Sequence, residues 1–65
     1  MKVTYDRQVD VIRILFSDSA IEESDEDKPG VILDYDSLGN VVGMEILDAS
    51  KRVADPRSCE YAITG

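Results

Sequence analysis

The segment from Pro29 to Ser50 decides the fold, and it reads P-G-V-I-L-D-Y-D-S-L-G-N-V-V-G-M-E-I-L-D-A-S. Residues 31–36 and 41–47 place apolar side chains at every second position, which is typical of half-buried strands. The four residues between them suit a hairpin loop, in which Gly39 takes the positive φ that such loops require. The segment therefore predicts a β-hairpin followed directly by the start of a helix.

The helix is predicted over residues 49–54. Asp48 is expected to cap its N-terminus, because a carboxylate can accept the free amide hydrogens of a first helical turn. Pro56 is expected to end the helix, because the residue before a proline is biased away from helical geometry. Within the second strand of the hairpin, Gly43 indicates a bulge or the close approach of another backbone.

The remaining chain predicts further strands. Residues 2–6 alternate like a strand, and residues 9–16 predict a central strand because they form the most apolar stretch and are rich in β-branched residues. Residues 20–28 predict an edge strand whose charges discourage further pairing. Residues 59–64 predict a last strand with its larger apolar side chains on one side.

The fold class predicted from these elements is α+β, mainly β. We expect an antiparallel β-meander of five or six short strands with one short helix near the C-terminus, in a single domain over residues 1–65. A chain of this length buries only about 60% of the surface that its unfolded chain exposes. Small domains often compensate with disulfides, bound metals or oligomerisation.

Of these three means of stabilisation, oligomerisation is the one that this composition allows. Cys59 is the only cysteine and there is no histidine, so a disulfide within the chain and a tetrahedral zinc site of Cys and His are both excluded. We therefore expect a homodimer. An unpaired cysteine also fits a reducing compartment.

Net charge and hydropathy restrict the partners and the cellular location that can be expected. The formal net charge is −7, from 14 acidic and 7 basic residues. Binding to nucleic acid phosphates needs clustered basic residues, so DNA and RNA are not expected partners, whereas a basic protein is. No stretch approaches the roughly 20 apolar residues of a membrane span, and the N-terminus lacks the apolar core of a signal peptide. The expected location is the cytoplasm, with no membrane partner.

Two charged clusters are candidates for an interaction surface: an acidic run in the expected edge strand and a basic cluster near the C-terminus. An acidic edge strand also guards against aggregation, and basic residues complement the dipole at the end of a helix. A sharper hypothesis pairs the acidic strand of one copy with the basic cluster of another across a two-fold axis. The candidate residues are Glu22, Glu23, Asp25, Glu26, Asp27, Lys51, Arg52 and Arg57.

Metal, cofactor and catalytic sites are not expected. Asp34, Asp36, Gly39 and Glu45 have the spacing of an EF-hand loop, but their flanks alternate like strands where an EF-hand needs helices. Without histidine, a Ser–His or Cys–His catalytic pair cannot form. Cys59 is expected to be a packed thiol rather than a reactive one. The protein is therefore not expected to be an enzyme.

Four motifs follow one another along the chain: M-K-V-T-Y-D, I-E-E-S-D-E, P-G-V-I-L-D-Y-D and V-G-M-E-I-L-D-A-S. In this order they resemble the domain of unknown function family 2283, a family of short prokaryotic proteins. The resemblance covers residues 1–53 and leaves a tail of residues 54–65. It implies a compact, mainly antiparallel β fold with a short helix after I-L-D-A-S, and no established activity. Some relatives are thought to be encoded beside small toxin-like proteins, which implies an antitoxin-like role.

Two functions of different classes follow. The first is a small acidic interaction or assembly module, homodimeric, which recognises a basic partner protein by charge complementarity. The second is a small-molecule or metal-binding domain whose pocket forms between subunits, so that a ligand stabilises the dimer against heat.

Overall fold

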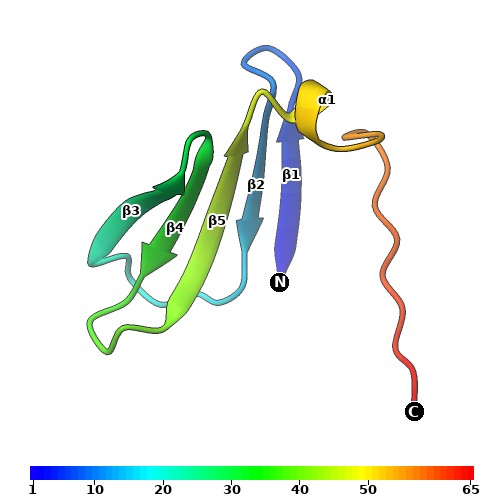
Figure 1. The fold of residues 1–65 in the computed structure, drawn as a ribbon. Helices are drawn as coiled ribbons and strands as arrows, with labels where there is room; N and C mark the ends of the chain where they lie inside the picture. The colour runs from blue at the N-terminus through cyan, green and yellow to red at the C-terminus, as the bar shows by residue number, and fades with distance from the viewer.

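The computed structural model describes all residues from Met1 to Gly65. They form a single antiparallel sheet of five strands in the order β1-β2-β5-β4-β3, followed by one short helix and a C-terminal tail, residues 53–65 (Figure 1). The predicted class, mainly β and antiparallel with one short helix near the C-terminus, is confirmed. The elements are β1 (Lys2–Asp6), β2 (Val11–Leu15), β3 (Glu23–Lys28), β4 (Val31–Tyr35), β5 (Val41–Leu47) and α1 (Ala49–Arg52).

The strand order departs from a simple meander at one point. Consecutive strands pair in β1–β2 and in β3–β4–β5, but β2 pairs with β5 and not with β3. The connection after β2 therefore carries the chain to the far edge of the sheet. This order places the apolar strands β2 and β5 side by side in the interior and leaves the acidic β3 at an edge, as its charges predicted.

The two faces of the sheet differ in polarity, because residues directly opposite each other on antiparallel strands project to the same side. Two rows of paired residues define the apolar face, together with Val42 in β5. The opposite side, called here the polar face, has Thr4, Arg13, Glu45 and Ile32 in one row. The rows of the apolar face are Val3–Ile14–Met44–Leu33 and Tyr5–Ile12–Ile46–Val31.

The chain buries very little of itself. Among apolar residues only Ile12, Val42 and Ala49 are buried. A folded protein of 7.2 kDa exposes about 4,100 Å², whereas this chain exposes 5141 Å². Its radius of gyration is 12.6 Å, against about 11 Å for a compact chain of this length. The sheet is a single layer that its own chain leaves largely open.

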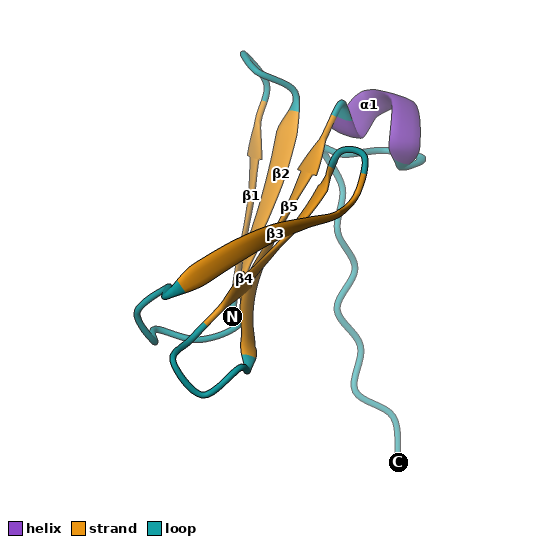
Figure 2. Ribbon diagram, turned by 60° about the vertical axis from the view of Figure 1, so that its left-hand side comes forward, coloured by secondary structure: helices purple, strands orange, loops and turns teal.

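The helix is shorter than predicted and is not capped by Asp48. It ends at Arg52. Asp48 has a left-handed backbone (φ 52°), and its side chain accepts no hydrogen bond from the first turn. Figure 2 shows α1 beyond the ends of the strands and to one side of the sheet, so it covers only one end. Residues 59–64 form no strand, and Tyr61 and Ile63 are exposed.

The hairpin of β4 and β5 forms as predicted. Gly39 has φ 82°. The register shifts by one residue between Asp34 and Tyr35, opposite Val42, so a bulge adjoins Gly43. A Cβ atom on Gly43 would lie 2.9 Å from Asp34 Oδ2 and 3.3 Å from the carbonyl oxygen of Ile14. Both expectations for Gly43, a neighbouring bulge and a close backbone approach, are confirmed.

Candidate functional site

The apolar face is one surface that the chain only partly covers. Its side chains come from β1, β2, β5 and β4, and most of them are only half buried. Val3 at the β1 edge is 44% exposed, and Phe16 after β2 is 41% exposed. Only Ile12 and Val42 are buried. The exposed apolar side chains of this face therefore lie at its β1 edge and at the end of β2.

A hydrogen-bond cluster at one end of the sheet fixes α1 beside the apolar face. The Asp10 carboxylate accepts bonds from the Tyr5 hydroxyl at 2.7 Å, the Ser50 amide at 3.0 Å and the Ser50 hydroxyl at 2.6 Å. The backbone amide of Ala49 donates to the Asp10 carbonyl at 2.9 Å. The bonds to the carboxylate, led by the one from the Ser50 hydroxyl, lower the pKa of Asp10. Asp10 thus supplies the cap that Asp48 was expected to give.

The acidic candidates lie together on the β3 edge. Glu22 precedes the strand and the other four lie within it, all exposed. Glu23 is opposite Tyr35 and Asp25 is opposite Leu33, so these two carboxylates border the apolar face. Glu26 projects to the other side, where its carboxylate accepts the Gly30 amide at 3.0 Å. The acidic run therefore forms one charged rim of the apolar face.

The basic candidates lie near α1, and two of them are engaged within their own chain. Arg52 donates to the Pro29 carbonyl at 2.7 Å, and a Cβ atom on Gly30 would overlap its guanidinium group. Arg57 pairs with Asp55 at 3.3 Å, and bonds from the Arg57 backbone and side chain lower the pKa of Asp55. Lys51 makes no ion pair. The structure does not bring the acidic and basic candidates into salt bridges within one chain.

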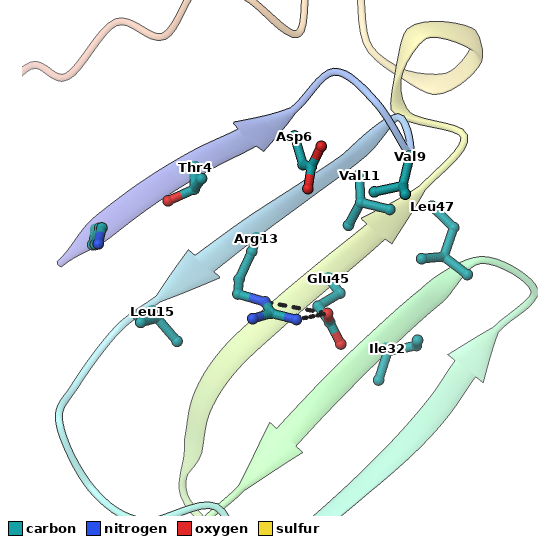
Figure 3. Close-up of a pocket in the computed structure, with 10 residues that line it drawn as sticks. Thr4, Asp6, Val9, Val11, Arg13, Leu15, Ile32, Glu45 and Leu47 are labelled. Atoms are coloured by element: carbon teal, nitrogen blue, oxygen red, sulfur yellow. Dashed lines mark hydrogen bonds and ion pairs between the residues drawn. The ribbon is translucent and has the colours of Figure 1, made fainter.

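A shallow hollow of about 480 Å³ lies on the polar face (Figure 3). At its centre, Arg13 on β2 donates to the Glu45 carboxylate on β5 through Nε at 3.2 Å and through Nη2. The bond to Glu45 raises the pKa of Arg13. Sequence reasoning missed this pair, since it depends on β2 lying next to β5. The other lining residues are Lys2, Thr4, Asp6, Val9, Val11, Leu15, Ile32 and Leu47.

The carboxylates with EF-hand spacing serve three separate purposes. Asp34 is buried and accepts the Ser24 hydroxyl at 2.6 Å. Asp36 accepts the amides of Leu38 and Asn40, both at 2.9 Å, and bonds led by that from the Asn40 side chain lower its pKa. Glu45 pairs with Arg13. Three carboxylates that are close in sequence thus stabilise a strand pair, a loop and a cross-strand ion pair.

Comparison with known proteins identifies the family. Residues 2–50 match the family described as "Protein of unknown function (DUF2283)", which is most of the 65-residue chain. The chain therefore belongs to this family, as its motifs indicated. Neither curated proteins nor solved structures gave a match. No helix of the chain has the length and apolar character needed to cross a membrane.

Proposed function

We propose that this DUF2283 protein is a small acidic interaction module that works as a homodimer, in which the apolar face of one copy covers the apolar face of the other. One observation carries the proposal: the sheet has a continuous apolar face on which most side chains are only half buried, with the tail beside Val3 and Tyr5 at its β1 edge. The exposed surface exceeds that of a compact protein of this mass by roughly 1,000 Å², and a standard protein interface buries about 800 Å² on each partner. The exposed tail contributes to this excess, and a face-to-face contact would bury an area of comparable size.

The acidic rim gives the dimer a means of recognising a further partner. Glu23 and Asp25 border the apolar face at its β3 edge, and no basic side chain of the same chain neutralises them. A basic protein is the partner that this charge attracts, and the sharpest form of the proposal is an antitoxin-like role. The net charge of −7 opposes nucleic acid and anionic membranes as partners. The proposed place of action is the cytoplasm, and the proposed role is binding without catalysis.

Two neighbouring residues of β4 offer a matched test of the dimer. Leu33 lies on the apolar face opposite Asp25, and Ile32 lies on the polar face opposite Glu26. Both are half buried. In each position a lysine gains an acidic cross-strand neighbour, which favours the folded strand pair. We expect Leu33→Lys to halve the molar mass of the assembly in sedimentation analysis, because a charge would be buried in the apolar contact.

The control is Ile32→Lys, which we expect to leave the molar mass unchanged. Circular dichroism checks that both variants keep their β content. If Leu33→Lys and Ile32→Lys assemble alike, the apolar face is not the contact between copies.

The acidic rim is tested separately by capturing partners of the tagged protein from its native host. A captured basic protein that is lost at raised salt, and lost with the double variant Glu23→Gln/Asp25→Asn, supports the antitoxin-like role.

The hollow on the polar face favours a second candidate function, a small-molecule or metal-binding domain; a pocket at a subunit interface here would need a contact through the polar face, on the side opposite the apolar contact. The hollow combines five apolar residues with a central Arg13–Glu45 pair, and such a mixture suits a small polar ligand. A ligand that binds only the folded dimer raises its melting temperature. Phosphate, citrate and divalent cations are suitable first probes. A rise that Arg13→Ala abolishes supports this function, and no rise with any probe argues against it.

A further inference from the structure

The two edges of the sheet differ in their charge. β1 pairs only with β2, and β3 pairs only with β4, so each has one open side. β3 carries four acidic residues and one basic one, Lys28 at its end, whereas β1 carries one basic and one acidic residue, at its two ends. The tail passes Val3 and Tyr5 on the apolar side, but it forms no backbone hydrogen bond to β1. The backbone on the outer side of β1 is therefore available for pairing.

The sequence of β1, K-V-T-Y-D, is complementary to itself in the antiparallel direction. Two copies centred on Thr4 place Lys2 opposite Asp6, Val3 opposite Tyr5, and Thr4 opposite Thr4. Opposite charges, a β-branched residue with an aromatic one, and paired threonines are all favourable cross-strand neighbours. The two members of each pair are either the same residue or lie two or four residues apart in the sequence. Since side chains alternate along a strand, both members point to the same face of the sheet. Every position of the strand is thus matched in one register.

No such register exists at the other edge. Two β3 strands centred on Asp25 set Asp25 opposite Asp25 and Glu23 opposite Asp27. Centring them on Glu26 sets Glu26 opposite Glu26 and Asp25 opposite Asp27. Like charges directly opposite each other destabilise a strand pair. Repulsion between like charges therefore disfavours pairing of two copies along β3, whereas no such repulsion opposes their pairing along β1.

We propose that two copies of this chain pair antiparallel along β1, centred on Thr4, and so join their sheets into one continuous sheet. The pairing places Val3 and Tyr5 of each copy beside those of the other, which extends the apolar face across the junction. Lys2 and Asp6 do not guard this edge against a second copy, because the register turns their charges into ion pairs. The edge contact goes beyond the face-to-face dimer of the proposed function and does not depend on it.

Exchanging the charges tests the contact. Lys2→Glu sets acids opposite acids at both ends of the pairing, and Asp6→Lys sets lysines opposite lysines, so each variant alone is expected to lose the edge contact. An equimolar mixture of the two restores both ion pairs, and we expect it to regain the molar mass of the wild type. If neither variant lowers the mass, or if the mixture does not regain it, the proposal is wrong. Since Asp6 also accepts the Gln8 amide at 3.0 Å, the folding of Asp6→Lys is checked by its melting temperature.

Disulfide trapping tests the register even if Asp6→Lys fails to fold. In a Cys59→Ser background, Thr4→Cys places two thiols directly opposite each other, at a Cβ separation of about 5 Å. We expect it to form a covalent dimer on mild oxidation. Lys2→Cys is the matched control, because its two thiols lie four residues apart along the strands, about 13 Å. Equal crosslinking of the two variants, or none in Thr4→Cys, overturns the register.

The trapping experiment also separates this contact from the face-to-face dimer. Adding Leu33→Lys removes the proposed apolar contact and leaves β1 intact. Crosslinking through Thr4→Cys that persists in this background supports an independent edge contact. Crosslinking that disappears with Leu33→Lys shows that the thiols meet only when the apolar contact is present, and it contradicts an independent edge contact.

Discussion

Asp10 and Asp48 have nearly the same backbone conformation, with φ of 58° and 52°, but only Asp10 holds the helix in place. Its carboxylate accepts three hydrogen bonds, two of them from Ser50, which is 40 residues away in sequence. The sequence alone pointed to Asp48, the residue next to the helix. A local rule cannot find a cap that comes from another part of the chain.

This difference predicts how acid affects the stability of the protein. The pKa of Asp10 is lowered from 3.8 by bonds from Ser50 and then from Tyr5, so its charged form favours the folded state. That contribution is complete above about pH 4 and is lost as the pH falls through the lowered pKa. We expect Asp10→Asn to lower the melting temperature at pH 7. Below pH 4 the melting temperatures of the variant and the wild type should converge, because the wild type then loses the contribution of the Asp10 charge.

The matched control is Asp48→Asn, which keeps a residue that tolerates a left-handed backbone and removes no side-chain cap. Its melting temperature should equal that of the wild type at every pH. If the melting temperatures of Asp10→Asn and the wild type fall equally with acid, the Asp10 carboxylate does not stabilise the folded state through its charge.

Tyr5 adds a change in stability at alkaline pH. Its pKa is raised above 10.0, chiefly by the bond to Asp10. Its contribution is therefore present below pH 10 and is lost as the pH rises through the raised pKa.

At the scale of elements, the strands and the β4–β5 hairpin were predictable because each depends on local sequence. Alternating apolar residues set the strands, and Gly39 with Asp36 sets the loop between them. The pairing of β2 with β5 was not predictable, because it depends on which strands lie side by side after the chain crosses the sheet. The Arg13–Glu45 pair and the hollow around it depend on that pairing, so the sequence could not reveal them either.

The hairpin loop allows a test of backbone strain without steric overlap. A Cβ atom on Gly39 would meet no atom within 4 Å, so any loss of stability on substitution comes from its φ of 82°. We expect Gly39→Val to reduce the free energy of unfolding by about 1 kcal/mol or more, because a β-branched residue is strained in this region. Gly39→Asn is the control and should lose less, since asparagine tolerates the left-handed region. Chemical denaturation measures both, and equal stability of Gly39→Val and wild type would exclude strain at this turn.

At the scale of the whole molecule, a single twisted sheet with a half-exposed apolar face (Figure 2) is unusual for an isolated chain. From its length and its lack of disulfide and zinc ligands, the sequence predicted a homodimer, but it did not predict a half-exposed apolar face. It also placed the acidic strand at an edge, as found. It did not show that Glu23 and Asp25 border the apolar face, because that depends on the register of β3 against β4.

We propose above that this chain completes its hydrophobic core with a second copy. The most direct test is sedimentation equilibrium of the wild-type protein over a wide range of concentrations. We expect a molar mass of at least twice the 7.2 kDa of one chain, falling only on strong dilution. A mass of 7.2 kDa at every concentration, in a protein that is folded by circular dichroism, would contradict the claim.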